Sequence, residues 1–333
     1  MLNIAVLGAG RIGQVHGKAV AATEGAQLVA VTDPFEKAAE ELTSRFGGDV
    51  RSMEQIEADS DVDAVIICTP TDMHADLIER FSRAGKSVFC EKPVDLSVER
   101  VQNCLKVVEE TGSTLMVGFN RRFDPDFNAL KNALDKGDIG KTELVAITSR
   151  DPGPPPYEYI ERSGGIFRDM MIHDFDIARW LLDDEVETVY ASGSVLVDEE
   201  IGNRGDFDTA SVVLTTASGQ QATITNSRRA AYGYDQRIEV HGSEGAAFAQ
   251  NKHQSTVEVA GVEGYTKPPL MDFFMDRYEA AYAIEIAAFV KAVSDGTEPP
   301  ATGHDGLMAL VLAEAADRSA REKSVISVQA ILG

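Results

Sequence analysis

Two residues that can move a proton stand four positions apart in the second half of the sequence, Asp169 and His173. The spacing of apolar residues predicts a helix over residues 166–182, which would place both side chains on one face. Histidine titrates near neutral pH, so His173 could take the proton of a hydroxyl group while hydride leaves the same carbon. Asp169 would then orient the substrate or fix the tautomer of His173. A carboxylate–histidine pair that only stabilises the helix is the alternative.

A lysine that could also take part in proton transfer follows an apolar stretch in the first half of the sequence. Residues 87–90 predict a buried strand, and Glu91-Lys92-Pro93 comes directly after it. The Lys92 ammonium group could donate a hydrogen bond to a substrate oxygen, and partial burial of an ammonium group favours proton transfer near neutral pH. A solvated loop lysine is the alternative. No metal site is predicted, because the cysteine and histidine ligand set typical of zinc is missing.

The segment Gly8-Ala9-Gly10-Arg11-Ile12-Gly13 has the glycine spacing of a dinucleotide-binding turn. It lies between a predicted strand and a predicted helix, whose N-terminus would offer N–H groups to a pyrophosphate. Asp33 closes the next predicted strand, where a carboxylate accepts hydrogen bonds from ribose hydroxyls and repels a 2′-phosphate. The sequence therefore predicts NAD rather than NADP as the cofactor. A glycine turn without a ligand, and an Asp33 that only caps a helix, are the alternatives.

A further turn at a strand end extends the predicted cofactor site. Thr69-Pro70-Thr71 follows an apolar run and could contact the cofactor through its backbone, although Thr71 could equally cap the next helix. Cys68 and Cys90, at the ends of neighbouring predicted strands, are interpreted as small core residues. The residues predicted to contact the cofactor are Gly8, Gly10, Arg11, Ile12, Gly13, Asp33, Thr69, Pro70, Glu91 and Lys92.

Other polar side chains could hold a substrate that carries hydroxyl groups. Asn120 could bind a hydroxyl, whereas Arg121 and Arg122 beside it are interpreted as counter-charges for acidic neighbours. Asp151 begins a proline-rich loop that could cover the site, and Tyr234 lies between two predicted strands. Simple loop or packing roles are equally open for both. The residues predicted to bind substrate are Lys92, Asn120, Asp151, Asp169, His173 and Tyr234.

The elements expected to position the first group of residues alternate along the first third of the chain. Continuous Val-, Ile- and Leu-rich runs predict strands of a parallel sheet covered on both faces, and amphipathic segments between them predict helices. The strands are expected at residues 3–7, 27–32, 64–68, 87–90 and 114–117, and the helices at 12–22, 36–45, 72–84 and 98–110. This order indicates an α/β fold class, with a doubly wound Rossmann domain over residues 1–122.

The pattern changes after Phe123, where longer stretches alternate partly between apolar and polar residues. They predict a large, mostly antiparallel open sheet, in which Ala217-Ser218-Gly219 forms a hairpin turn. The strands are expected at residues 143–148, 186–197, 209–216, 221–226 and 237–241, and the helices at 127–135, 166–182, 277–294 and 305–322. Residues 123–333 are therefore predicted to form an α+β domain for substrate binding and oligomerisation.

Composition limits the classes of function. The 333 residues contain 31 Lys and Arg against 54 Asp and Glu, a net charge of −23, which disfavours binding to nucleic acid or to anionic lipid. No apolar run approaches the roughly 20 residues that span a bilayer, and no cationic lead before an apolar core indicates a signal peptide. Three cysteines cannot all pair within one chain, which favours reduced thiols. We expect a cytoplasmic protein whose partner is a small molecule.

Together these residues resemble the glucose–fructose oxidoreductase, inositol dehydrogenase and MocA family, and the resemblance covers essentially the whole chain. The glycine-rich turn is common to many folds, but Glu91-Lys92-Pro93 combined with Asp169-x-x-x-His173 is specific to this family. Further segments resemble its myo-inositol 2-dehydrogenase branch, namely Val117 to Asp124, Ser149 to Pro152, Gly164 to Asp176 and Tyr232 to Arg237.

The resemblance implies NAD-dependent oxidation of the axial hydroxyl of myo-inositol to scyllo-inosose. It implies a catalytic set in which His173 is the base, Lys92 contacts the reacting oxygen and Asp169 binds an adjacent hydroxyl. It also implies a cis Lys92–Pro93 bond and a homodimer or homotetramer formed through the open face of the second sheet. Two alternatives stay open: a dehydrogenase for scyllo-inositol, D-chiro-inositol, glucose or another cyclic polyol, and a non-catalytic NAD-binding sensor.

Overall fold

The structure, a computed structural model, describes residues 1–333, which form two compact units. The first contains Met1–Asp124 and Ala280–Leu310, and the second contains Pro125–Glu279 and Val311–Gly333. The division therefore differs from the two continuous ranges expected from the sequence, because residues 280–310 return to the first unit. They do so through aromatic packing: the ring of Phe289 lies 5.7 Å from that of Phe89 in the first sheet.

The first unit is built on a six-stranded parallel sheet in the order β3-β2-β1-β4-β5-β6. Its strands are β1 (Leu2–Leu7), β2 (Ala26–Thr32), β3 (Asp49–Val50), β4 (Ala64–Ile67), β5 (Ser87–Glu91) and β6 (Leu115–Gly118). Every residue of β4 is buried, as expected for a parallel strand covered on both faces. The strand order reverses between β1 and β4, so ligands are expected at the carboxyl ends of these strands. The predicted doubly wound sheet is confirmed.

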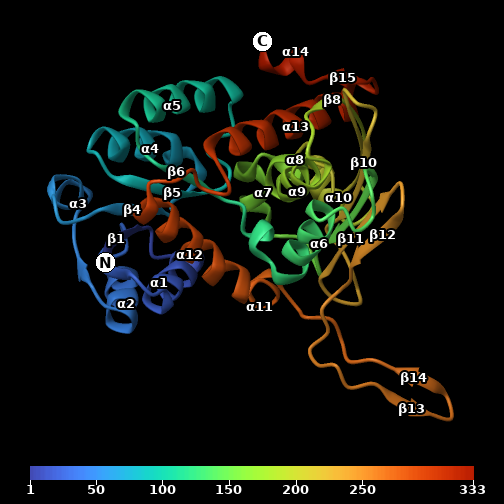
Figure 1. The fold of residues 1–333 in the computed structure, drawn as a ribbon, viewed down its shortest axis with the longest axis horizontal. Helices are drawn as coiled ribbons and strands as arrows, with labels where there is room; N and C mark the ends of the chain where they lie inside the picture. The colour runs from blue at the N-terminus through green and yellow to red at the C-terminus, as the bar shows by residue number, and fades with distance from the viewer. The chain divides into compact units, whose positions relative to one another are not determined.

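Helices cover both faces of this sheet (Figure 1). One face carries α1 (Arg11–Ala22), α2 (Glu36–Phe46) and α12 (Glu279–Asp295), and the other carries α4 (His74–Arg83) and α5 (Val98–Thr111). The short helix α3 (Met53–Ala58) and the strand β3 were not predicted, because runs of two to six residues show too little periodicity. The helix α4 begins two residues later than expected because Thr71–Met73 form a 3₁₀ turn.

The second unit is built on a seven-stranded sheet in the order β12-β11-β7-β10-β9-β8-β15, in which only the pair β7 and β10 is parallel. Its strands are β7 (Thr142–Arg150), β8 (Val186–Ser194), β9 (Thr209–Thr216), β10 (Gln221–Ser227), β11 (Asp235–Gly242), β12 (Gly245–Ala249) and β15 (Ile326–Ser327). The turn predicted at residues 217–219 joins β9 to β10, and Gly219 supplies its left-handed backbone at φ +89°. The mostly antiparallel sheet is confirmed.

Burial alternates along these strands, so one face of the sheet packs on helices and the other is open. The helices of this part of the chain are α6 (Pro125–Asp135), α7 (Tyr157–Ser163), α8 (Gly165–Asp169), α9 (Ile172–Leu182), α10 (Glu199–Asn203), α11 (Phe274–Arg277), α13 (Gly303–Glu322) and α14 (Gln329–Leu332). Among them, α9 makes the most extensive contact with β7. No helix in the chain is both long and apolar enough to cross a membrane.

The prediction of one continuous helix over residues 166–182 is wrong. The helix α8 ends at Asp169, and α9 begins at Ile172 after a turn at Met170 and Met171. Met170, Met171 and Ile172 are all buried. At the turn the N–H groups of Met170 and Met171 both donate to the Ile166 carbonyl, so one hydrogen bond spans five residues instead of the four of an α-helix.

A two-stranded arm extends from the second unit (Figure 1). Its tip consists of β13 (Val259–Gly261) and β14 (Gly264–Thr266), and every residue from 254 to 267 is exposed. The arm was not predicted, because strands of three residues are too short to show an alternating pattern.

Candidate functional site

The glycine-rich turn lies at the end of β1, where the sheet has its expected ligand edge. Gly8 has a φ of +99°, which favours glycine. A Cβ atom at Gly13 would lie 2.0 Å from the Gly8 carbonyl oxygen, so only glycine allows α1 to approach the turn this closely. Gly10 precedes α1, and no atom lies within 4 Å of the place where its Cβ would be. This open space at the N-terminus of α1 fits a pyrophosphate.

Asp33 follows the neighbouring strand β2 and is connected to the same turn. Its Oδ2 accepts a hydrogen bond of 2.7 Å from the Ala9 N–H, and its Oδ1 accepts one of 2.8 Å from the Phe35 N–H. Each carboxylate oxygen can accept a further bond. The half-buried carboxylate thus fixes the turn and still has acceptor capacity for ribose hydroxyls, which fits NAD.

The turn after β4 is held by a histidine that the sequence analysis did not single out. His74, the first residue of α4, is buried, with its Nδ1 2.8 Å from the carbonyl oxygen of Pro93 and its Nε2 2.8 Å from that of Thr69. The ring therefore connects the turn after β4 to the turn after β5. Thr71 does not cap α4, because the capping residue is Met73 and its side chain makes no hydrogen bond.

The turn after β5 contains Glu91, Lys92 and Pro93, and its Lys92–Pro93 bond is cis, as the family resemblance implied. The Glu91 carboxylate is also held by a histidine: its Oε1 lies 2.7 Å from Nε2 of the fully buried His16 on α1. A salt bridge or hydrogen bond this short in a buried location fixes the carboxylate strongly. Lys92 therefore stands between two residues that are each connected to a buried histidine.

Cys68 and Cys90 are core residues, as predicted. Both thiols are buried, and burial raises their pKa well above the usual value for cysteine. The negative charge of Glu91 raises the pKa further for both. They stay protonated thiols at neutral pH, which removes them from nucleophilic chemistry.

In the second unit, Asp169 is held by an arginine and a tyrosine. Its Oδ1 accepts a hydrogen bond of 2.8 Å from the Tyr159 hydroxyl, and its Oδ2 lies 3.5 Å from Nη1 of Arg228. His173 lies in the first turn of α9, beyond the break in the helix. Asp169 and His173 therefore lie on two helices rather than on the single continuous helix that the spacing predicted, and their pairing stays a prediction.

Arg228 lies between two carboxylates. It is 1% exposed, and its Nη2 lies 3.5 Å from Oδ2 of Asp206. Asp206 also accepts a hydrogen bond of 2.9 Å from the Ile166 N–H at the start of α8. Burial raises the pKa of Asp206, and the Arg228 charge opposes this rise. The buried cation thus holds the Asp169 carboxylate at the end of α8, and no local pattern in the sequence predicts this role.

The other three residues predicted to bind substrate, Tyr234, Asp151 and Asn120, are each held by a different kind of contact or burial. Tyr234 is buried and its ring packs edge-on against Tyr278, with centroids 6.2 Å apart. The Asp151 N–H donates to the Ser227 carbonyl, which fixes the start of its loop. Asn120 is buried in a 3₁₀ turn that also contains Arg122.

Arg122 has the counter-charge role that was predicted for it. Its Nη2 lies 3.0 Å from Oδ1 of Asp305, and its Nη1 donates to the Pro300 carbonyl at 2.8 Å. Burial alone would raise the pKa of Asp305, but the Arg122 charge and hydrogen bonds from Thr302 outweigh it and lower this pKa to about 2.

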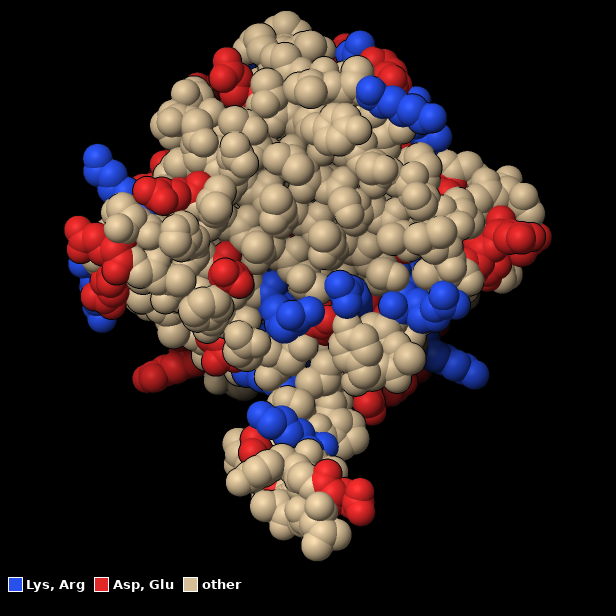
Figure 2. All heavy atoms as spheres, turned by 90° about the vertical axis from the view of Figure 1, so that its right-hand side faces the viewer, with Lys and Arg blue, Asp and Glu red and all other residues tan.

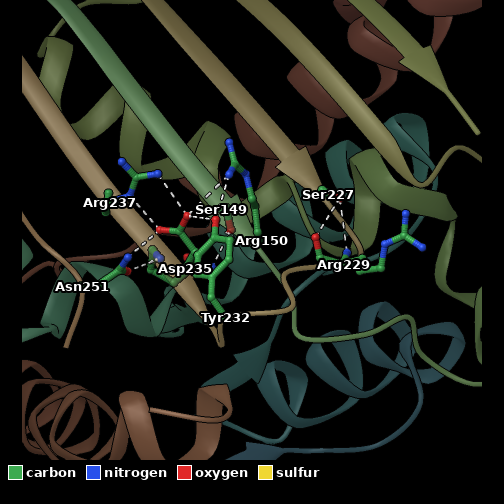
Figure 3. A network of polar contacts seen from close by, with 9 residues as sticks. Ser149, Arg150, Ser227, Arg229, Tyr232, Asp235, Arg237 and Asn251 are labelled. Carbon is green, nitrogen blue, oxygen red and sulfur yellow. Dashed lines mark hydrogen bonds and ion pairs between the residues drawn. The ribbon is translucent and has the colours of Figure 1, made fainter. Parts of the chain in front are cut away.

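The loop before β11 forms a polar network with Asp235 at its centre (Figure 3). The Tyr232 hydroxyl donates to Oδ2 of Asp235 at 2.6 Å and accepts from Nη1 of Arg150 at 2.8 Å. Arg237 and Asn251 both donate to Oδ1 of Asp235 at 2.7 Å. These bonds lower the pKa of Asp235 although its burial acts in the opposite direction. The network fixes the loop that carries Tyr234.

The structure thus brings the predicted cofactor residues together at one sheet edge, at the ends of β1, β2, β4 and β5. It adds three residues that the sequence analysis missed, His16, His74 and Arg228. The only local signal was the position of His16, three residues after the last glycine of the turn, and a histidine within a helix is not by itself distinctive.

Two family profiles match separate parts of the chain. One is described as an oxidoreductase family with an NAD-binding Rossmann fold, GFO/IDH/MocA, and matches residues 2–119. The other is the GFO/IDH/MocA C-terminal domain and matches residues 127–248. Together they cover most of both units.

Individual proteins are similar over the full length. An inositol 2-dehydrogenase of Rhizobium meliloti (strain 1021) is 60% identical over 98% of this chain and 99% of its own. A myo-inositol 2-dehydrogenase of Thermotoga maritima is 44% identical over the whole of both chains. The solved structure of a scyllo-inositol dehydrogenase from Lactobacillus casei, with bound NAD(H) and scyllo-inositol, superposes with a TM-score of 0.91 at 28% identity, covering 99% of each chain.

Proposed function

This chain belongs to the GFO/IDH/MocA oxidoreductase family, and we propose that it is an NAD-dependent inositol 2-dehydrogenase that oxidises myo-inositol to scyllo-inosose. The observation that carries the proposal is the full-length similarity to inositol 2-dehydrogenases, at 60% and 44% identity. The first unit binds NAD, whose nicotinamide ring supplies the hydride acceptor when it is bound. We assign NAD binding to the first unit and substrate binding to the second.

The reaction removes a hydride from carbon and a proton from the hydroxyl oxygen on that carbon, which leaves a ketone. We propose that His173 takes the proton, that Lys92 donates a hydrogen bond to the same oxygen, and that Asp169 accepts a hydrogen bond from an adjacent hydroxyl. A fixed donor on the oxygen and a fixed acceptor beside it reduce the entropy lost on reaching the reactive geometry. Asn120, Asp151 and Tyr234 are proposed as further partners of the substrate hydroxyls.

Deuterium at the oxidised carbon of myo-inositol tests this reaction. The deuterium should appear in the reduced cofactor, and turnover should slow if hydride transfer limits the rate. Reduced cofactor that forms without deuterium would show that a different carbon of myo-inositol is oxidised. A second candidate substrate, scyllo-inositol, is favoured by the similarity to the Lactobacillus casei enzyme that binds it, and the same labelling experiment with that isomer distinguishes the two.

We also propose that the protein assembles into a homodimer or homotetramer through the open face of the second sheet. This face carries large apolar side chains from separate strands, with Leu144, Tyr190, Val213 and Phe248 all exposed. Lys, Arg, Asp and Glu residues gather around its border and leave a broad uncharged centre (Figure 2). Tyr190 and Val213 lie directly opposite each other on β8 and β9. An exposed apolar patch of this kind is typical of an interface.

Light scattering combined with size-exclusion chromatography tests the assembly. Val213→Lys places a charge in the centre of the face and should give monomers. Val262→Lys, a matched change at an exposed valine on the arm, should leave the assembly unchanged. A wild-type protein that is monomeric at micromolar concentration would contradict the proposal. We further propose a cytoplasmic location, which the three free cysteines support.

A further inference from the structure

The hydrogen bonds of His74 require an unusual number of protons. Both ring nitrogens lie 2.8 Å from an oxygen, and both oxygens belong to backbone carbonyls, of Thr69 and of Pro93. A carbonyl oxygen only accepts hydrogen bonds, so each ring nitrogen must donate. A neutral imidazole has one N–H, and its other nitrogen would point a lone pair at a carbonyl oxygen. The geometry therefore fits the imidazolium form.

The second histidine near the same turn provides a comparison within the molecule. Nε2 of His16 faces the Glu91 carboxylate, whereas its Nδ1 is buried and has no hydrogen-bond partner. A proton on that Nδ1 would be a buried donor without an acceptor, which is costly. His16 thus needs one ring proton, on Nε2, and His74 needs two, although both side chains are almost completely buried.

Two effects oppose a charge on His74. The residue begins α4, where the helix dipole disfavours a cation, and burial disfavours any charge. Both are offset by the two acceptors, because hydrogen bonds from a charged donor are about twice as strong as neutral ones. The neutral form with its proton on Nδ1 would leave Nε2 and the part-buried carbonyl oxygen of Thr69 facing each other without a proton.

We propose that His74 carries both ring protons in the folded protein and acts as a positioning residue for Lys92. Thr69 follows β4 and Pro93 follows β5, which are neighbouring strands, so the ring fixes the distance between the two turns. Lys92 directly precedes Pro93 and follows Glu91, which His16 holds. The lysine backbone is thus fixed on both sides. The positioning role rests on the proposed function of Lys92, whereas the proton count does not.

Nitrogen-15 NMR of histidine-labelled wild-type protein tests the proton count directly. The His74 signals are assigned as those missing from the spectrum of His74→Gln. Both His74 nitrogens should have the chemical shifts of protonated nitrogen at pH 7, and His16 should show one protonated and one unprotonated nitrogen. An unprotonated nitrogen in the His74 ring would overturn the proposal. This result does not depend on any substrate.

Kinetics of His74→Phe test the positioning role, because phenylalanine keeps a planar ring but has no donors. We expect kcat to fall about tenfold or more, since small displacements of a reacting group are costly, while the Kd for NAD in calorimetry rises by a smaller factor, because Gly8, Gly10 and Asp33 stay in place. His74→Gln keeps one donor and should give an intermediate kcat. Ser82→Ala is the matched control, because Ser82 is a buried residue of the same helix whose hydroxyl has no hydrogen-bond partner.

The outcomes separate the two proposals. A His74→Phe protein with wild-type kcat would overturn the positioning role, and so would a loss of NAD binding as large as the loss of kcat. Should His74→Phe fail to fold, His74→Gln and the wild-type NMR spectrum still decide. A wild-type protein that binds NAD, shows the expected His74 spectrum and oxidises no polyol would contradict the proposed function but not the proton count.

Discussion

The two units hold their proposed catalytic groups in different ways. In the first, the turn with Lys92 is held by hydrogen bonds from two buried histidines to a carboxylate and to a backbone carbonyl. In the second, the Asp169 carboxylate is held by the buried cation Arg228 and by the Tyr159 hydroxyl. One unit fixes the position of a backbone turn, and the other fixes a side-chain charge.

The difference has consequences for what a substitution changes. Removing Lys92 itself leaves the turn and its histidines intact, so chemistry should be lost while folding is kept. Removing Arg228 leaves the carboxylates of Asp169 and Asp206 close together and without their cation, so folding itself should suffer. If removing Lys92 and removing Arg228 had the same effect on turnover and on stability, this difference between the two units would be contradicted.

The largest effect is expected for Lys92→Met, which keeps the length and the apolar stem of the side chain. Loss of the donor to the reacting oxygen should lower kcat about 10²- to 10⁴-fold, the usual contribution of acid–base groups. Calorimetry should give a Kd for NAD that changes far less than kcat, because the glycine-rich turn and Asp33 stay in place, and urea unfolding should give an unchanged stability. Turnover that survives this change would remove Lys92 from the catalytic set.

The next effect is expected for Arg228→Met, compared with Arg229→Met as a control at the exposed neighbouring position. The first change should reduce the free energy of unfolding by about 3 kcal/mol, because it leaves buried charge uncompensated. The second should change it by less than about 0.5 kcal/mol. Urea titrations followed by circular dichroism measure both. Equal stability of the two variants would show that Arg228 does not hold Asp169 through its charge.

A smaller effect is expected for an ion pair of the first unit that holds no reactive group, Arg122 with Asp305. The pKa of Asp305 is about 2 in the folded protein against an ordinary 3.8, so the charged form contributes about 2 kcal/mol of stability above pH 4. Asp305→Asn should lose this amount at pH 7. The difference from wild type should shrink as the pH falls from about 4 to 2, because Asp305 then becomes protonated in both states. Denaturant titrations at several pH values measure it, and a difference that does not depend on pH would contradict the ion pair.

The smallest effect is expected for Tyr159→Phe, which removes one hydrogen bond to Asp169 and leaves Arg228 in place. The bond is exposed, so its loss should cost only about 1 kcal/mol and lower kcat about fivefold. Steady-state kinetics with saturating cofactor measure it. A loss of a hundredfold or more would show that the tyrosine, rather than the cation, dominates the position of Asp169.

The elements with long or fully buried patterns could be predicted from the sequence. The strands β1, β4 and β5 are continuous apolar runs because both faces of a parallel sheet are covered. Short elements such as β3 and β13 were missed because they contain too few residues for a period. The break between α8 and α9 was missed because apolar spacing does not show where a hydrogen bond across five residues replaces the four-residue bond of an α-helix.

The candidate site divides in the same way. The glycine-rich turn, Asp33 and Lys92 could be predicted because their chemistry is visible within a few residues of sequence. The groups that hold them could not, because the partners are distant in the chain. His16 and Glu91 are 75 residues apart, and only the fold brings them within a hydrogen bond. Arg228 follows β10, and nothing near it in the sequence points to Asp169.

The most direct measurement is the formation of NADH by the purified protein with NAD or NADP, across myo-inositol, scyllo-inositol, D-chiro-inositol and glucose. We expect strong activity with NAD and myo-inositol, and much weaker activity with NADP because Asp33 repels its 2′-phosphate. Activity with only one of the other polyols would leave the proposed mechanism unchanged and show that this polyol, not myo-inositol, is the substrate. A protein that binds NAD in calorimetry but reduces it with none of these compounds would contradict the proposed dehydrogenase and support an NAD-binding sensor.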